Sequence, residues 1–263
     1  MNNLKLVMES ELNDLDFIDS DFHLKALKGG AVNSSYHLKS FNKSYFIKTF
    51  ESDKIALLDR KRLFDIQTAL AANGLAVKPL YLSKSHDFQI DQWHDALTLD
   101  QAGLSRLTIT KSLASGLSIL HNTQIDAPKL DLPYQWQHYM ELINMPISTS
   151  QQQTLDAYAD IWHQACLDKS VFCHNDLASS HVTHTYPSKF FDWEYCAISC
   201  PYFDLASCAL INGFGKADEA SLYAFYAQYS EQRLSEVIAK VNTMKPLVEL
   251  TNKLWYQAAI QST

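Results

Sequence analysis

The first third of the chain alternates hydrophobic and polar residues with the two-residue period of β-strands. Segments 23–27, 34–41 and 43–50 carry this pattern, and the polar turn at 41–44 joins the last two as a hairpin. Residues 77–93 contain two further strand-like segments. The pattern therefore predicts a small antiparallel sheet in this part of the chain.

Hydrophobic residues recur at helical spacing in the other segments. In the first part of the chain, residues 53–72 have this spacing and Asn73-Gly74 provides a C-terminal stop, while residues 10–18 suit a short helix. After Trp93 the same spacing predicts helices at 107–123, 151–168, 217–230 and 233–261. Two strand-like segments, 170–173 and 188–191, interrupt these helices and predict a small hairpin.

These patterns predict an α+β fold with two lobes. The first lobe, residues 1–92, combines the small sheet with one helix packed against it. The second lobe, residues 93–263, is mostly helical. No glycine- or serine-rich linker separates them, so we expect lobes packed on one another rather than independent domains.

Composition and charge narrow the classes of function. The 263 residues are 47% hydrophobic with a formal net charge of −7, so a large core is available and no basic face indicates a nucleic-acid partner. The first residues lack the apolar stretch of a signal peptide, and no apolar run approaches a membrane span. With five cysteines and no CxxC pair, we expect reduced thiols in the cytoplasm and no membrane partner.

One glycine pair stands out in a chain with only seven glycines. Gly29 and Gly30 lie between two strand-like segments, in the stretch LKGGAVNSSYHL. Backbone N–H groups in such a turn can bind a phosphate. An ordinary hairpin turn is the simpler alternative.

Lys48 occupies an unusual position in the third strand-like segment. Alternation places it between Phe46 and Phe50 on one face of the strand. Either the strand lies at an edge and the ammonium reaches water, or the lysine faces an anion.

Histidine and acidic residues gather between positions 171 and 204. His174 and Asp176 follow one strand-like segment, and Asp192 follows the next. A hairpin between the two segments would bring Asp192 beside the loop that contains Asp176. Phosphoryl transfer uses one carboxylate to orient the attacking hydroxyl and accept its proton, and another to hold Mg²⁺ on the nucleotide phosphates.

The order of these features resembles the aminoglycoside phosphotransferase and choline kinase family, a branch of the protein-kinase-like fold that includes choline, ethanolamine and bacterial thiamine kinases. The specific part is CHNDL, FFDWEY and PYFDLAS within residues 171–206, and LKGGAVNSSYHL is similar to the family's looser nucleotide loop. The resemblance implies a nucleotide-binding N-lobe, a catalytic and substrate-binding C-lobe, and ATP-dependent phosphorylation of a hydroxyl group on a small molecule.

The resemblance also implies which residues form the site. Asp176 would be the catalytic base, His174 would support its loop from behind, and Asp192 would bind Mg²⁺. ATP would contact the loop, the strand lysine and the hinge, namely Gly29, Gly30, Asn33, Ser34, Lys48, Ile90, Gln92 and Trp93. The acceptor, a choline-, ethanolamine-, thiamine- or aminoglycoside-like alcohol, would lie near acidic and aromatic groups that suit a cation, namely Trp193, Glu194, Tyr195 and Tyr202. Asp204 would hold the second lobe together rather than react.

Two positions depart from the family pattern. The residue five after Asp176 is His181, where the family has a metal-binding asparagine. Imidazole suits softer ions than Mg²⁺, so the alternatives at His181 are binding of Mn²⁺ or Zn²⁺, action through water, or a weakened site. The family's strand lysine also pairs with a glutamate on the next helix. The helix expected next offers Asp59 and Asp65 and no glutamate, and Asp65 is expected by its position to contribute to the nucleotide site.

Two alternatives to a kinase stay open. A weakened metal site at His181 would make the chain a pseudokinase or a nucleotide-binding module. A zinc site would use cysteine and histidine side chains, namely Cys173, His174, His181, His184, Cys196 and Cys200, although their spacing matches no usual zinc pattern. The sequence leaves the acceptor and the oligomeric state open.

Overall fold

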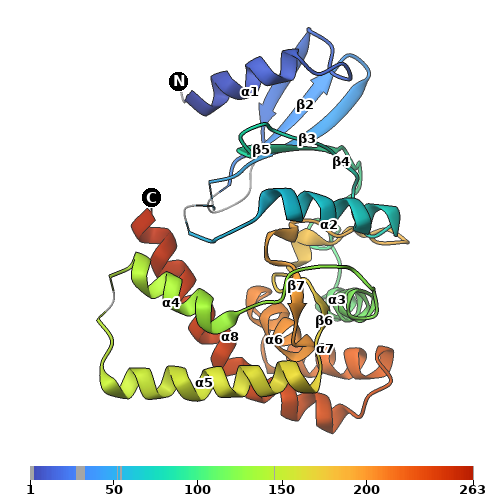
Figure 1. The fold of residues 1–263 in the computed structure, drawn as a ribbon. Coiled ribbons are helices and arrows are strands. Elements are labelled where there is room, and N and C mark those ends of the chain that lie inside the picture. Colours follow the sequence, from blue (N-terminus) through green and yellow to red (C-terminus); the bar gives the residue numbers. More distant parts are fainter. Residues whose placement is uncertain (1–2, 28–32, 52, 54, 145, 263) are drawn as a thin grey trace. The chain divides into compact units, whose positions relative to one another are not determined.

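The computed structural model describes residues 3–27, 33–51, 53, 55–144 and 146–262. The chain divides into two compact units, Met1–Asp95 and Ala96–Thr263, and each has its own architecture (Figure 1). An antiparallel sheet dominates the first unit and helices dominate the second. The predicted α+β class, with a small-sheet N-lobe and a mostly helical C-lobe, is confirmed.

The sheet of the N-terminal unit contains all the strands that the alternating pattern predicted. Its antiparallel order is β1-β2-β3-β5-β4, formed by β1 (Phe22–Ala26), β2 (Ser35–Ser40), β3 (Lys43–Thr49), β5 (Phe88–Gln92) and β4 (Pro79–Leu82). On β3, Tyr45 and Ile47 are buried, while Phe46 and Lys48 on the opposite face are half-buried. The two-residue period therefore separates a core face from a face that carries polar groups.

Helix α1 (Asn3–Asn13) packs against the core face of the sheet (Figure 1). Met8 and Leu12 from this helix are buried with Leu38, Ile47 and Ile90 from three different strands. Each such side chain contributes about 1.5–3 kcal/mol of burial free energy relative to an exposed position. This shared apolar face fixes the sheet register, because a slip by one residue would turn it outward.

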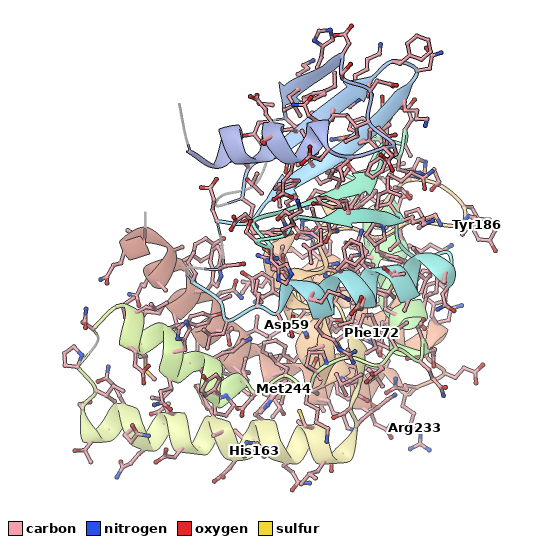
Figure 2. All side chains as sticks on the ribbon, turned by 45° about the horizontal axis from the view of Figure 1, so that its top comes forward. Asp59, His163, Phe172, Tyr186, Arg233 and Met244 are labelled. Carbon is pink, nitrogen blue, oxygen red and sulfur yellow. The ribbon has the colours of Figure 1, made fainter. Side chains whose placement is uncertain are left out.

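Two helix boundaries in the N-terminal unit differ from the prediction. Helix α1 ends at Asn13, so it does not cover the predicted segment 10–18. Helix α2 (Arg60–Ala72) begins only after Asp59, well inside the predicted segment (Figure 2). The Asp59 carboxylate accepts from the backbone N–H of Arg62 at 2.9 Å, which caps the helix and sets its start.

The C-terminal unit is mainly helical. Its long helices are α3 (Arg106–His121), α4 (Leu132–Leu142), α5 (Thr149–Asp168), α6 (Pro201–Ile211), α7 (Lys216–Tyr229) and α8 (Leu234–Ser262) (Figure 1). Helix α3 lies along α7, and α6 lies along α8. None of the helices in the described ranges is long and apolar enough to cross a membrane.

Helices α4 and α6 were not predicted, and each has a local reason. Nearly every residue of α6 is buried, so the helix lacks the polar face that would reveal its period. Helix α4 is short and begins at Leu132-Pro133, where proline is a turn signal as well as a suitable first-turn residue.

The predicted hairpin of the C-terminal unit pairs differently. Strand β6 (Val171–Cys173) lies where expected, but its antiparallel partner is β7 (Ala197–Ser199) rather than residues 188–191. Within 188–191, Phe190 forms a single bridge with Val182. The chain still turns back between these two residues, so the segment that leads to Asp192 returns toward the loop after β6.

Gly116 allows α3 to lie close to that returning segment. A Cβ atom at this position would be 2.7 Å from Cε1 of Phe190, which is shorter than carbon atoms normally approach. Phe190 is only 1% exposed, so its ring has little room to move. The absence of a side chain at Gly116 thus lets the segment that leads to Asp192 pack directly against α3.

Candidate active site

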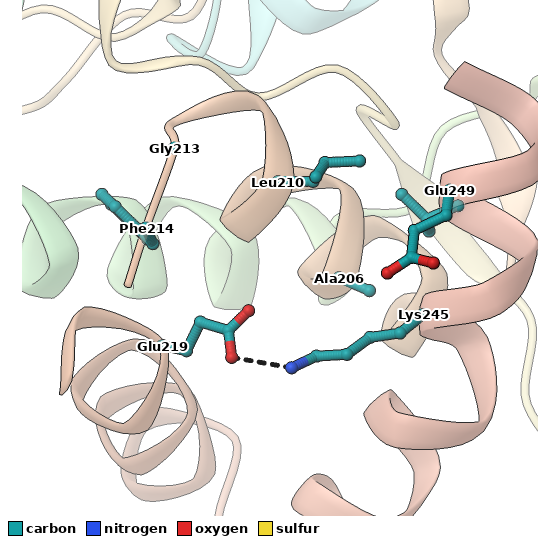
Figure 3. Close-up of a pocket in the computed structure, with 8 residues that line it drawn as sticks. Ala206, Leu210, Gly213, Phe214, Glu219, Lys245 and Glu249 are labelled. Atoms are coloured by element: carbon teal, nitrogen blue, oxygen red, sulfur yellow. Dashed lines mark hydrogen bonds and ion pairs between the residues drawn. The ribbon is translucent and has the colours of Figure 1, made fainter. Parts of the chain in front are cut away.

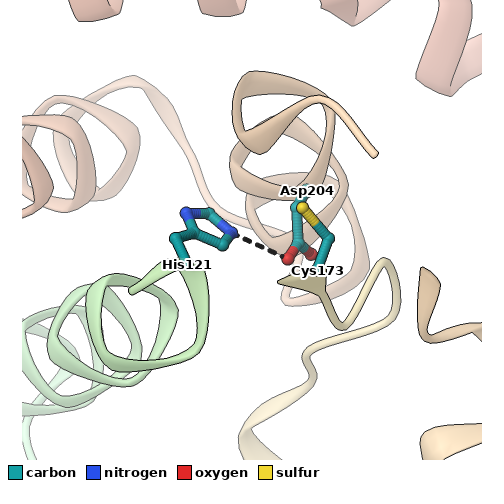
Figure 4. A group of neighbouring side chains, drawn as sticks. All are labelled: His121, Cys173 and Asp204. Carbon is teal, nitrogen blue, oxygen red and sulfur yellow. Dashed lines mark hydrogen bonds and ion pairs between the residues drawn. The ribbon is translucent and has the colours of Figure 1, made fainter. Parts of the chain in front are cut away.

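The loop that follows β6 is fixed by Asp204, near the start of α6. The two carboxylate oxygens of this buried side chain accept from the backbone N–H groups of His174 and Asn175 at 2.9 and 2.8 Å. Asp204 also lies 3.0 Å from Nε2 of His121 (Figure 4). Both carboxylate oxygens therefore hold the backbone next to Asp176, in line with the structural role expected for Asp204.

Asn175 completes this support and was not singled out from the sequence. Its backbone is left-handed, with φ 62°, a conformation that asparagine tolerates better than most residues. Its side chain donates to the carbonyl of Tyr195 at 2.9 Å and accepts from the hydroxyl of Ser199 at 2.8 Å. Its own carbonyl accepts from Ser207 at 2.9 Å. A residue that is held on every side presents the following residue, Asp176, in one orientation.

His174 acts behind the loop. Its Nε2 donates to the carbonyl of Phe191 at 2.8 Å, so the loop is tied to the residue immediately before Asp192. Burial lowers the pKa of His174 to about 4, which keeps the imidazole neutral at physiological pH. These contacts describe a positioning residue rather than one that exchanges a proton with a substrate.

His181, in the short helix η2 (Ser179–His181), lies between the two aspartates. Its Nδ1 is 2.8 Å from the backbone carbonyl of Asp176. A carbonyl can only accept, so Nδ1 carries the hydrogen and the neutral ring has its lone pair on Nε2. That Nε2 is 3.6 Å from Oδ2 of Asp192, whose backbone is also left-handed with φ 62°. An imidazole nitrogen and a carboxylate oxygen at this separation can bind the same metal ion.

Glu194 and Tyr195, in the short helix η3 (Trp193–Tyr195), lie among aromatic side chains from distant helices. The hydroxyl of Tyr195 accepts from Nε1 of Trp255 on α8 at 2.8 Å. Burial and the nearby charge of Glu194 raise the pKa of both Tyr195 and Tyr139, the latter on α4. A carboxylate is thus grouped with Tyr139, Tyr195 and Trp255, and sequence analysis missed the residues from α4 and α8 because they lie far along the chain.

Two predicted acceptor residues lie elsewhere. Trp193 is 5% exposed and packs on His174, with ring centroids 4.9 Å apart, so it belongs to the core behind the loop. The hydroxyl of Tyr202 donates to Gln232 at 2.6 Å, and Lys240 lies 5.0 Å above its ring. A lysine over this ring occupies the face that a cationic ligand would need. These two assignments are corrected.

The predicted nucleotide loop is anchored to the end of β3. The side chain of Asn33 accepts from the backbone N–H of Glu51 at 2.8 Å, and the hydroxyl of Ser34 donates to the Glu51 carboxylate at 3.1 Å. Gly29 and Gly30 lie outside the described residues. The role of Asn33 and Ser34 in covering phosphates stays a prediction.

The predicted hinge divides between the two faces of the sheet. Ile90 is fully buried in the core under α1, so its side chain is not available to an adenine, and its part in the hinge stays a prediction. Trp93 stacks on His37, with ring centroids 4.0 Å apart. Gln92 is exposed, and its backbone N–H donates to the backbone carbonyl of Lys78. Adenine contact at Gln92 and Trp93 stays a prediction.

Asp65 does not face Lys48. It lies on the exposed side of α2, where the ammonium of Lys61, one turn earlier, donates to its carboxylate at 2.6 Å. The other candidate on this segment, Asp59, caps the helix. The assignment of Asp65 to the nucleotide site is therefore corrected, because helix periodicity points this position toward solvent.

The side chains proposed for a zinc site do not form a cluster of metal ligands in the described residues. In the part of the chain that the structure describes, three potential ligand side chains lie within 4.8 Å of one another only at His121, Cys173 and Asp204 (Figure 4). Burial raises the pKa of the Cys173 thiol well above its usual range, which disfavours the thiolate that zinc requires. The hydrogen bond between His121 and Asp204 explains this group without a metal.

A pocket in the C-terminal unit lies among α6, α7 and α8, and its lining includes none of the residues predicted for the site (Figure 3). Leu210 and Phe214 line it together with Glu219, Lys245 and Glu249. Nζ of Lys245 donates to Glu219 at 2.7 Å, so this lysine's charge is already balanced.

Comparison with protein families gives a match over most of the chain. Residues 23–240 match the model described as the phosphotransferase enzyme family. A relative from Mycoplasma capricolum subsp. capricolum, "Protein LicA homolog", is 26% identical over 127 residues. That match covers 47% of this chain and 52% of the relative, so it spans about half the relative's length.

Solved structures with the same fold cover nearly the whole chain. Choline kinase LicA from Streptococcus pneumoniae superposes with a TM-score of 0.73 at 20% identity, covering 98% of this chain and 91% of that one. An ethanolamine kinase from Plasmodium vivax gives 0.74 at 18% identity, covering 98% and 82%. A spectinomycin phosphotransferase solved with ADP and spectinomycin gives 0.55 at 17% identity, covering 98% and 99%. At these identities the likeness shows the fold.

Proposed function

Because the chain belongs to the phosphotransferase enzyme family, we propose that it is an ATP-dependent kinase that phosphorylates the hydroxyl group of a small cationic molecule. One observation carries this proposal. His181 binds the carbonyl of Asp176 through one ring nitrogen and lies 3.6 Å from the Asp192 carboxylate with the other. Asp176 and Asp192 therefore lie on opposite sides of the His181 imidazole.

Asp176 is the proposed catalytic base. Its carboxylate would accept the proton of the acceptor hydroxyl as that oxygen attacks the terminal phosphate of ATP. The backbone beside it is held by Asp204 and by the side chain of Asn175. A base fixed in this way loses little orientational freedom when the substrate arrives, which lowers the barrier.

The residues present fit a divalent cation, with Asp192 and His181 as its protein ligands. Such an ion, when bound, neutralises negative charge on the transferring phosphoryl group. The hydrogen bond at Nδ1 fixes the tautomer that leaves Nε2 free to coordinate, as outer hydrogen bonds do for metal-bound histidines. A mixed nitrogen and oxygen ligand pair suits Mn²⁺ better than Mg²⁺.

A cationic acceptor is supported by the group around Glu194. Its carboxylate lies close enough to Tyr139 and Tyr195 to raise the pKa of both phenols. Tyr139 is buried, but Tyr195 is only half-buried, and an aromatic face beside a carboxylate binds ammonium groups through cation–π and charge interactions. Two of the similar structures are named for kinases of choline and ethanolamine, which are amino alcohols of this kind.

ATP as the phosphoryl donor is supported by the nucleotides named with similar structures, AMP with LicA and ADP with the spectinomycin phosphotransferase. Lys48 is the proposed phosphate contact of the N-terminal unit. It lies on the face of β3 opposite the core and is not part of the apolar cluster under α1.

A coupled assay over choline, ethanolamine, thiamine and aminoglycosides, with Mg²⁺ and with Mn²⁺, tests the proposal. We expect ATP-dependent phosphorylation of at least one amino alcohol, and a loss of at least about 10²-fold in kcat for Asp176→Asn. Asp160→Asn, an exposed position on α5, is the matched control and should keep wild-type turnover. Equal turnover by Asp176→Asn and the wild type would refute the role of Asp176.

A pseudokinase is the second candidate, and His181 favours it because this position departs from the family pattern. The same protein distinguishes the two functions. A thermal shift with metal and ATP but no turnover on any acceptor, with either metal, would support the binding module and exclude the kinase.

A further inference from the structure

The N-terminal unit buries one carboxylate on the same face of the sheet as Lys48. Asp91, on β5, is 9% exposed. Burial raises its pKa to about 6, and the nearby charge of Lys48 opposes that rise. An acid on the polar face of a central strand is costly to bury, and such groups persist where a partner or a function requires them.

The sheet register places these two side chains within reach of each other. In the β3–β5 pairing, Lys48 is opposite Gln89 and Phe46 is opposite Asp91. Residues two apart on a strand point to the same face, so Lys48 and Asp91 are diagonal neighbours. Diagonal neighbours lie about 7–8 Å apart between Cα atoms, a distance that a lysine side chain spans.

Two glutamines orient the carboxylate. Nε2 of Gln89 donates to Oδ1 of Asp91 at 2.7 Å and to Oε1 of Gln67, on α2, at 2.9 Å. Nε2 of Gln67 donates to the carbonyl of Val77 at 3.2 Å. This chain of amides joins the carboxylate to α2, so the helix sets its direction without supplying an acid of its own.

We propose that Asp91 is the carboxylate that positions the Lys48 ammonium toward the nucleotide phosphates, in place of an acid on α2. This inference rests on the proposed ATP-dependent function. It assigns Asp91 a positioning role, since Asp91 acts through Lys48. The acids of α2 do not compete for this role, because Asp65 pairs with Lys61 and Asp59 caps the helix.

A double-mutant cycle on nucleotide binding tests the pairing. We expect Asp91→Asn to weaken ATP binding about tenfold and to leave adenosine binding within about twofold, because only phosphates contact Lys48. Lys48→Met should weaken ATP binding at least as much. In the Lys48→Met background, Asp91→Asn should have no further effect beyond about twofold. Asp65→Asn is the matched control and should bind both nucleotides as the wild type does.

A second measurement does not depend on ATP. In protein whose lysines carry ¹³C-methyl labels, the Lys48 resonance, assigned with Lys48→Arg, should titrate about one pH unit lower in Asp91→Asn, because a nearby carboxylate stabilises the ammonium. An unchanged titration, equal loss of adenosine and ATP affinity, or a full Asp91→Asn effect without Lys48 would overturn the inference. A normal Lys48 shift in a protein that binds no ATP would overturn the proposed function instead.

Discussion

Replacing Asp91 by asparagine should stabilise the protein at neutral pH, although it removes a hydrogen-bonded side chain. The asparagine keeps the shape of the carboxylate and an oxygen that can accept from Gln89, but it carries no charge. The change therefore isolates the cost of burying the ionised acid. A site that retains a destabilising charge is expected when function requires that charge.

The magnitude follows from the pKa of Asp91, which is raised from 3.8 to about 6. Each pKa unit corresponds to about 1.4 kcal/mol, so ionised Asp91 costs about 3 kcal/mol at neutral pH. The pKa of Asp91 is higher in the folded protein than in the unfolded chain. Protonated Asp91 therefore carries no such cost below pH 3.8, and the free energy of unfolding falls as pH rises through about 6. Roughly half of that loss falls between pH 5 and pH 8.

Urea unfolding of the wild type and Asp91→Asn at pH 5 and pH 8 measures this term. Far-UV circular dichroism and tryptophan fluorescence should give coincident transitions if the comparison of free energies is to hold. We expect the stability advantage of Asp91→Asn over the wild type to grow by about 1 to 2 kcal/mol between the two pH values. The exposed control Asp65→Asn should change stability by less than about 0.5 kcal/mol. If the difference between Asp91→Asn and the wild type were the same at both pH values, folding would not raise the pKa of Asp91 and the reasoning would be refuted.

The C-terminal unit gives three further predictions. Gly116→Ala should lower the unfolding free energy by up to about 2 kcal/mol, because the added methyl group meets Phe190; urea unfolding measures it, and Phe190→Leu in the same chain should restore the loss. Asp204→Ala should cost about 3 kcal/mol or more, since two buried N–H groups lose their acceptor, and an unchanged melting temperature would contradict this role. His181→Asn should lower the ratio of Mn²⁺- to Mg²⁺-supported turnover about tenfold, measured with saturating ATP; an unchanged ratio would show that His181 does not bind the metal.

The amino-acid pattern by itself predicted the strands of the sheet and four of the long helices. These elements have one buried face and one polar face, so their periods appear directly in the sequence. The segment from 107 to 123 is an example, since α3 covers nearly the same residues. Helix α6 escaped the same reasoning because it is buried on almost every side.

Local sequence also singled out the residues around Asp176, Asp192 and His181, which the structure brings together. It did so because these histidines and carboxylates directly follow short apolar segments, and polar loops set on strands commonly carry functional sites. The order of the motifs along the chain was enough to suggest the family, which the match over residues 23–240 shows.

Tertiary structure alone decided which side chains meet. Asp65 was expected to serve the Lys48 site by its position on the predicted helix, yet in the structure it pairs with Lys61 on the exposed side of α2. Asp91 was not singled out from the sequence, and only the pairing of β3 with β5 placed it on the face of Lys48. Likewise, Tyr139 and Trp255 join Glu194 and Tyr195 only through the packing of α4 and α8. Periodicity fixes the face on which a residue lies, but only the register and packing of distant segments determine which charges share that face, because those contacts leave no local pattern in the chain.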